Sequence, residues 1–179
     1  MALAILVYMA VQPAVAQTRE LTSDEEKALQ EQIGKMQYKE SVKAVNDTFF
    51  TLEADRLTFR TGYTVDVTSS TNFITVDKGR ASVQTAFNVP VSGANGMGGV
   101  TVDGTVSNYK VTTEERSGDT LVSMSVMGVG ISATVRIRLE KDSNKASAEI
   151  MPDFNSDNLR MSGTLLPSDR STVFKGRSL

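Results

Sequence analysis

The 179-residue chain contains no cysteine, no histidine and no tryptophan. Without cysteine it can form no disulfide, thiol nucleophile or thiolate metal site. Without histidine it also lacks the commonest general base and the commonest ligand of transition metals. These absences exclude most kinds of catalysis, so we expect a protein that is not an enzyme and that needs no metal or cofactor.

An excess of charge of one sign is also missing, because 19 basic residues nearly balance 21 acidic ones and leave a net charge of −2. Such a balance produces no strong field, so nucleic acids and anionic membranes are poor candidates as partners. The one local excess lies in residues 158–179, where Asp169 stands against Arg160, Arg170, Lys175 and Arg177. Scattered cations of this kind usually form a solvated tail.

The chain opens with an apolar run, Ala2–Val11, which is too short for a membrane-spanning helix of about 20 residues. Ala14-Val15-Ala16 then matches the small-residue cleavage site of a signal peptide. No lysine or arginine precedes the run, which leaves open a translation start further upstream or an atypical leader, and an ordinary buried helix is the alternative. We predict a signal peptide over residues 1–16, cleavage after Ala16, and a mature protein that is periplasmic or secreted, without a lipid anchor.

Residues 17–48 form a predicted N-terminal helical segment. Thr22 and Glu25 have the spacing of a capping box, which favours a helix start there. Two apolar stripes follow on nearly opposite faces: Leu29, Ile33 and Met36 on one, and Tyr38, Val42 and Val45 on the other. A straight helix can bury only one of them, so we expect a break near Gly34–Gln37 or a loosely attached first half. The second half, Tyr38–Val45, is the part predicted to pack on the domain.

From Phe49 onward the apolar pattern changes to a period of two, and residues 49–179 are predicted to form an antiparallel β domain. The alternation is strict from Ile131 to Glu140 and extends over shorter runs at 50–54, 63–67, 81–89, 100–102, 146–150 and 159–165. Closely spaced turn signals favour hairpins over parallel crossovers. The pattern predicts a mainly β fold, an up-and-down barrel of about eight strands behind an N-terminal helix, with a two-sheet sandwich as the alternative.

The densest glycine segment contains Gly93, Asn95, Gly96, Met97, Gly98 and Gly99. It is not a phosphate-binding loop, because neither a Lys-Ser or Lys-Thr pair nor a helix follows it. The simpler interpretation is a long hairpin loop. We take these six residues as the candidate contact loop.

Other patterns are weaker. Ser107 and Lys110 have the Ser-x-x-Lys spacing of some acyl-transfer enzymes, but in a strand we expect them on opposite faces. Residues 153–158 match only part of a calcium loop, since Thr164 stands where a glutamate is needed. Carboxylates that could do hydrolytic work are Glu53, Asp55 and Asp103, which nothing marks as facing one another. Methionines that could line a cavity or fill the core are Met124, Met127, Met151 and Met161.

Several stretches together resemble a family of uncharacterised exported bacterial proteins catalogued as domain of unknown function 4251. They are residues 50–56, 71–73, 87–93, 98–104, 107–110, 127–133 and 173–179. The resemblance covers the chain from about Leu29 to Leu179. It implies a lipocalin-like barrel behind an N-terminal helix and supplies no activity, substrate or catalytic residue.

Two non-enzymatic functions are compatible with these observations. The first is an exported barrel that binds a small apolar or amphipathic ligand, which requires a hollow interior. The alternative is an envelope protein-interaction or structural module, which a filled interior beside an exposed apolar patch would favour. A hydrolase that uses carboxylates alone is a third hypothesis, and it requires two carboxyl groups that converge in a cleft.

Overall fold

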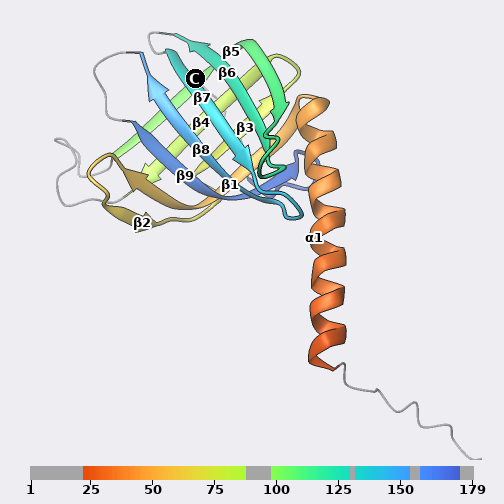
Figure 1. Cartoon of the computed structure of the whole chain (residues 1–179). Helices are drawn as coiled ribbons and strands as arrows, with labels where there is room; N and C mark the ends of the chain where they lie inside the picture. Colours follow the sequence, from red (N-terminus) through yellow and green to blue (C-terminus); the bar gives the residue numbers. More distant parts are fainter. Residues whose placement is uncertain (1–21, 88–97, 130–131, 154–157, 174–179) are drawn as a thin grey trace, which may run out of the picture.

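A computed structural model of the chain describes residues 22–87, 98–129, 132–153 and 158–173. It shows one helix, α1 (Ser23–Asn46), followed by a β-barrel (Figure 1). The strands are β1 (Phe49–Phe59), β2 (Thr64–Asp66), β3 (Phe73–Asp77), β4 (Arg80–Phe87), β5 (Gly98–Thr113), β6 (Thr120–Gly128), β7 (Ser132–Leu139), β8 (Lys145–Pro152) and β9 (Leu159–Pro167).

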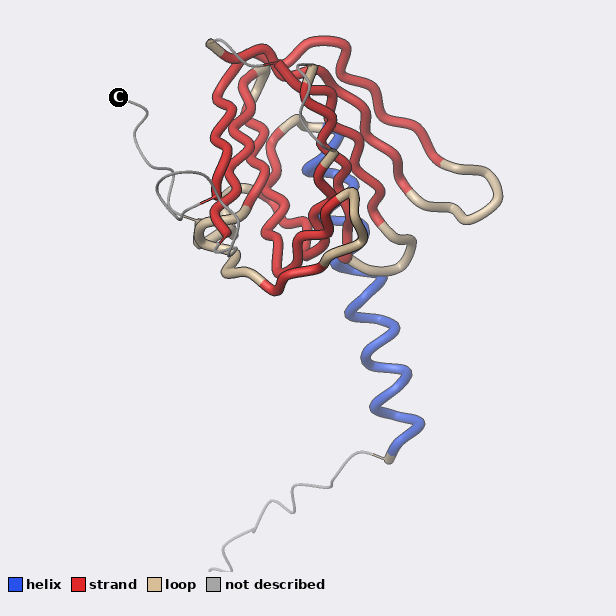
Figure 2. Tube along the Cα trace, turned by 90° about the vertical axis from the view of Figure 1, so that its left-hand side faces the viewer, coloured by secondary structure: helices blue, strands red, loops and turns tan. Residues whose placement is uncertain are grey.

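Each strand from β3 to β8 pairs antiparallel with the next one along the chain, as hairpins require. Strand β9 pairs back with β1 from Phe50↔Pro167 to Phe59↔Leu159, which closes eight strands into a ring. Strand β2 stays outside the ring and pairs with the far half of β1. The predicted up-and-down barrel is therefore confirmed, and the sandwich is not formed. Figure 2 shows the strands wrapped around a common centre, with α1 leaving from one end.

The alternating sequence pattern places apolar side chains inside the ring. In β7, Val135 and Ile137 are buried, whereas Arg136 and Arg138 are exposed on the outer wall. The same alternation recurs in β6 and β8. One apolar core therefore runs through the described barrel, as an antiparallel sheet with one dry face requires.

Strand β3 has no such alternation, because its outer face is also buried. Phe73 pairs with Glu53 of β1, and Thr75 pairs with Thr51. The chain returns over this face after β9: Ser171 donates a hydrogen bond to Glu53 at 2.7 Å, and Thr51 and Ser168 are joined at 3.1 Å. Because both faces of β3 are covered, its sequence does not fully follow the alternation of apolar and polar residues by which the other strands were predicted.

Helix α1 starts as predicted. The Glu25 carboxylate accepts from the Thr22 backbone N–H at 2.9 Å, and the Thr22 hydroxyl accepts from the Glu25 N–H at 3.4 Å, which makes a capping box. The predicted break near Gly34–Gln37 is absent, and the helix is continuous to Asn46. The other expectation, a first half that is only loosely attached, describes the helix: its second half packs on the barrel, and its first half projects from it (Figure 1).

Candidate functional site

The described part of the barrel interior is packed by its own side chains. Phe50, Leu52, Leu57, Met161 and Leu165 have no surface that a water-sized sphere can touch. A hollow large enough for a ligand would leave such surface on the side chains that line it. These residues therefore leave no room for a ligand at the level of the barrel where they lie.

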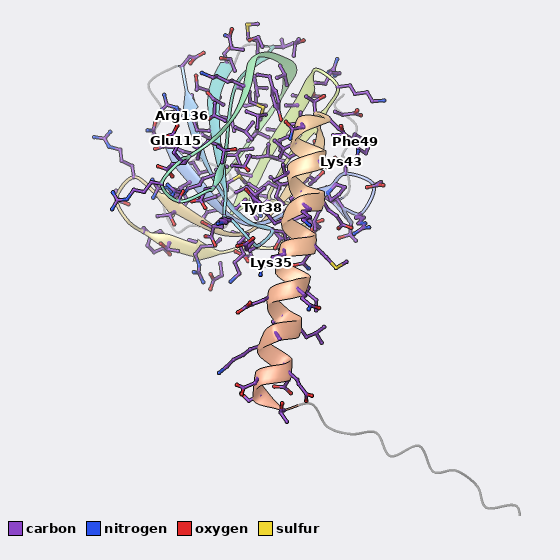
Figure 3. The ribbon with its side chains drawn as sticks, turned by 45° about the vertical axis from the view of Figure 1, so that its right-hand side comes forward. Lys35, Tyr38, Lys43, Phe49, Glu115 and Arg136 are labelled. Atoms are coloured by element: carbon purple, nitrogen blue, oxygen red, sulfur yellow. The ribbon has the colours of Figure 1, made fainter. Side chains whose placement is uncertain are left out.

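The second half of α1 is fixed to one end of the barrel by specific hydrogen bonds. The Tyr38 hydroxyl donates to the Gly118 carbonyl oxygen at 3.0 Å and lies 2.9 Å from the Thr120 hydroxyl. Ser41, which is buried, donates to the Leu165 carbonyl oxygen at 2.8 Å. The predicted packing of Tyr38–Val45 on the domain is thus confirmed, and in Figure 3 Tyr38 lies where α1 meets the barrel.

The first half of α1 projects into solvent, with every residue from Thr22 to Ile33 exposed (Figure 3). Leu29, Ile33 and Met36 remain 44%, 37% and 64% exposed. At 100° per residue they fall within a sector of about 60°, and Tyr38 lies about 180° from Leu29. We call these three side chains, with Glu25 and Lys39 on one edge, the contact face. It lies on the side of the helix opposite Tyr38, which contacts the barrel.

A hollow of about 250 Å³ continues the contact face at the barrel end of the helix. Glu40 and Lys43 of α1 and Asp47, which follows its last residue, line one side, and Asp169 and Arg170 line the other. The Arg170 guanidinium lies 2.6 Å from the Glu40 carboxylate and ties the returning segment to the helix.

A larger hollow of about 740 Å³ lies on the outer wall of β5 to β9. Strand register places one row of side chains across it: Lys110 pairs with Ser123, Ser123 with Arg136, Arg136 with Glu149, and Glu149 with Arg160. Within the described residues, Lys110, Arg136 and Arg160 form no ion pair. We call this row the basic groove; its cations outnumber its acid on a protein with a net negative charge.

Arg138 flanks the basic groove and is held by two carboxylates. It lies 2.6 Å from Asp119 and 2.8 Å from Glu114, both in the β5–β6 connection. A hydrogen bond from the Lys141 backbone N–H, and further bonds from Arg138 and Ser117, keep the pKa of Asp119 below its ordinary value. This cluster anchors the connection that Tyr38 of α1 contacts.

Lys110 reaches the groove because β5 contains a bulge. The register with β6 shifts between Ser107 and Lys110, and Asn108 adopts a positive φ of 54°. Ser107 and Lys110 therefore share the outer face, and the expectation that they lie on opposite faces was wrong. Lys110 is exposed, and no hydrogen bond joins it to Ser107 among the described residues, so the pair shows no nucleophile–base geometry.

Two other candidates from the sequence fall largely on residues that the structure does not describe. Gly93, Asn95, Gly96 and Met97 lie outside the described residues, as do residues 154–157 of the calcium-like stretch. Gly98 and Gly99 begin β5 and pair with Phe87 and Ala86 of β4.

The three acids considered for hydrolysis are also separate in the structure. Glu53 accepts hydrogen bonds from Ser171 and Thr172, Asp55 is exposed, and Asp103 pairs with Arg80 at 3.3 Å. Across the described ranges, no three histidine, cysteine, aspartate or glutamate residues gather as a metal site. In the same ranges no helix is both long and apolar enough to cross a membrane.

The methionines divide between core and surface. Met124 and Met161 are buried in the core, whereas Met127 is exposed on β6 and Met151 is half-buried on β8. They therefore do not line a common cavity.

Sequence reasoning identified the stripe of the contact face but missed the basic groove. Arg136 and Arg138 stand at polar positions of the alternating pattern from Ile131 to Glu140, which predicts that both are exposed. Lys110 and Arg160 join them only through the pairing of five strands, one of them bulged, which a single sequence does not reveal.

Comparison with known proteins gives a family but no activity. A crystal structure of a DUF4251 family protein from Bacteroides eggerthii DSM 20697 is similar to this chain, with a TM-score of 0.72 and 45% sequence identity over 83% of this chain and 99% of that one. No curated protein matches. The family model described as "Domain of unknown function (DUF4251)" matches residues 32–165, which include the strands from β1 to β8 and most of β9. The chain belongs to the DUF4251 family.

Proposed function

We propose that this protein is an exported, non-enzymatic protein-interaction module whose barrel presents the contact face of α1 to another protein. The observation that carries the proposal is the exposed stripe of Leu29, Ile33 and Met36 on a helix that projects from a packed barrel. Apolar side chains aligned on one face of a helix usually mark the face that becomes buried.

The projecting position of the stripe adds to this argument. The barrel has already used the opposite face of α1, through Tyr38 and Ser41, so its own surface does not cover the stripe. A helical segment without tertiary contacts is marginal in water, because most helix stability in proteins comes from packing of an apolar face. Burial of the stripe by a partner would supply that stabilisation.

Binding of a small apolar ligand inside the barrel has less support. Such a ligand needs a hollow interior, and the side chains at the level of Leu52 and Met161 fill that space.

Site-specific photo-crosslinking in the cells that produce the protein tests the proposal. A photoreactive amino acid at Ile33 should give a covalent adduct of one reproducible mass, because this side chain lies in the middle of the contact face. The matched control is the same probe at Glu31, which is also exposed but lies about 160° around the helix from Ile33. Equal labelling at both positions, or no adduct at Ile33, would count against the proposal.

Export is part of the proposal and has its own test. Residues 2–16 support it, since an apolar run is followed by Ala14-Val15-Ala16. The intact mass of protein recovered outside the cytoplasm should correspond to a chain that begins at Gln17. A chain that retains Met1 in the cytoplasm would contradict this part.

Anion binding in the basic groove is a second candidate function. Lys110, Arg136 and Arg160 stand about two strand spacings apart, roughly 10 Å, a separation suited to an extended ligand with several negative groups. Titration with short-chain polyphosphate should show binding that weakens as salt is raised. Arg136→Gln should weaken it, and Arg116→Gln, at an exposed turn outside the groove, should not. Equal binding by both variants would refute this candidate.

A further inference from the structure

The contact face has the spacing of a short coiled-coil seam. Leu29, Ile33 and Met36 are separated by four and then three residues, which are the d, a and d positions of a heptad. Apolar residues at these positions pack into the side-chain holes of a second helix, and three consecutive layers are present here. The spacing therefore fits a helix as the occupant of the face.

The distribution of charge along α1 indicates which helix occupies the contact face. Residues 23–31 carry four acids and one base, for a net charge of −3, and residues 35–46 carry three bases and one acid, for a net charge of +2. A second copy of α1 that runs antiparallel would place the acidic half of each copy beside the basic half of the other. It would also oppose the two helix dipoles. A parallel pair would instead place like charges together.

We propose that the contact face pairs with the same face of a second copy of this chain in an antiparallel helix pair; this inference rests on the proposed function and names its partner. With Ile33 facing Ile33 of the second copy, Leu29 faces Met36 of the second copy. Glu25 and Lys39 lie on the same edge of the stripe, four residues before Leu29 and three after Met36. In the antiparallel register Glu25 comes beside Lys39 of the second copy, and two-fold symmetry forms this ion pair twice.

The barrel leaves room for this arrangement. Gly34, Tyr38 and Ser41 contact the barrel from the opposite side of the helix, so the second copy finds Leu29, Ile33 and Met36 exposed. The 250 Å³ hollow beside Glu40 and Arg170 lies where the first turn of the second helix would arrive. That turn carries Asp24, Glu25 and Glu26, and the exposed Arg170 guanidinium is a cation on the receiving side.

The pair is closed, because both copies use the same surface and none is left for a third. Three apolar side chains per copy make a small interface, so the dimer forms weakly and in a concentration-dependent manner. Its formation is measurable by sedimentation equilibrium of the mature chain over a wide range of concentration.

The absence of cysteine permits a sharp test of the register. Ile33→Cys should form a covalent dimer on mild oxidation, because Ile33 faces its own counterpart across the two-fold axis. Leu29→Cys and Met36→Cys should each stay monomeric alone and link when the two variants are mixed. Lys27→Cys, exposed on the far side of the helix, is the control and should not link in any combination.

Charge reversal gives an independent readout. Glu25→Lys or Lys39→Glu alone should raise the dimer Kd roughly tenfold, because each change turns attraction into repulsion at two symmetric sites. The double variant Glu25→Lys/Lys39→Glu should regain most of the affinity. Circular dichroism of each variant separates this effect from loss of the helix, since Glu25 also caps it.

The outcomes distinguish this inference from the proposed function. Self-linking of all three contact-face cysteines would indicate a parallel pair and overturn the proposed register. A monomer at every concentration, together with an Ile33 photo-adduct of a mass other than twice the chain, would refute self-pairing and leave the interaction module standing. Neither dimer nor adduct would refute both.

Discussion

The hydroxyl group of Tyr109 on β5 donates a hydrogen bond to the backbone carbonyl oxygen of Val45, 2.6 Å away in the last turn of α1. Tyr109 follows Asn108 in the β5 bulge, so the irregularity that turns Lys110 outward also directs this ring to the helix. The bond joins the barrel wall to the buried end of α1 and thereby helps to fix the direction in which the contact face projects.

Tyr109→Phe removes this bond and should lower the free energy of unfolding by about 0.5–1.5 kcal/mol at pH 7. Burial raises the pKa of Tyr109 to about 12. Because the unfolded phenol titrates near pH 10, the stabilisation is full below pH 10 and is lost as the pH rises toward 12. Urea denaturation of both proteins from pH 7 to 11 should therefore show a difference that shrinks above pH 10. A difference that grows with alkaline pH would contradict this assignment.

Gly34→Ala should destabilise the protein even though alanine is the better helix former by about 1 kcal/mol. A Cβ atom on Gly34 would lie 2.4 Å from the backbone carbonyl oxygen of Asp142, a contact that side-chain movement cannot relieve. The helix would have to shift away from the β7–β8 turn. Gln37→Ala is the matched control at an exposed helical position and should change the melting temperature little. A higher melting temperature for Gly34→Ala would show that α1 is not held against this turn.

Asp119→Asn should lower the free energy of unfolding by about 1–3 kcal/mol at pH 7, because a largely buried carboxylate loses its charge-assisted bonds to Arg138 and the Lys141 N–H. The pKa of Asp119 is lowered in the folded protein, so its contribution is present above about pH 4 and is lost as the pH falls through the lowered value. Denaturation series for both proteins between pH 7 and 2 should converge at the acid end. A constant difference down to pH 2 would argue against the ionised carboxylate as the cause.

Met161→Ala should cost about 2–5 kcal/mol of stability, because this side chain is fully buried among the core residues. Met127→Ala makes the same chemical change where the side chain is 53% exposed, and it should stay within about 0.5 kcal/mol of the parent. Equal and small effects in the two variants would mean that the interior around Met161 is loosely filled, which is what a ligand-binding barrel requires.

The barrel and the course of α1 could be predicted because they follow from local periodicity. Strand β7 alternates without exception. The two stripes of α1 lie on nearly opposite faces of the helix, so one of them has to stay out of the barrel. The sequence did not decide between a bent helix and a straight one that projects from the barrel. Gly34 suggested a bend, but in the structure it allows α1 to approach the Asp142 backbone closely, and this contact is not visible in the sequence.

Other features depend on contacts between distant segments. Strand β3 has two buried faces because the segment after β9 returns across Thr51 and Glu53. The basic groove needs the register of five strands and the bulge before Lys110, and neither is encoded within one strand. A single sequence indicates on which face of a strand a residue lies more clearly than it indicates which residues lie beside it on the neighbouring strands.

Native mass spectrometry of the mature protein, purified gently from the cells that make it, tests the central claim most directly. The account predicts a bare chain mass, or one joined to a second chain, with no small molecule retained. A single chain that reproducibly carries an extra small-molecule mass, lost on denaturation, would contradict it and identify the barrel as a ligand carrier.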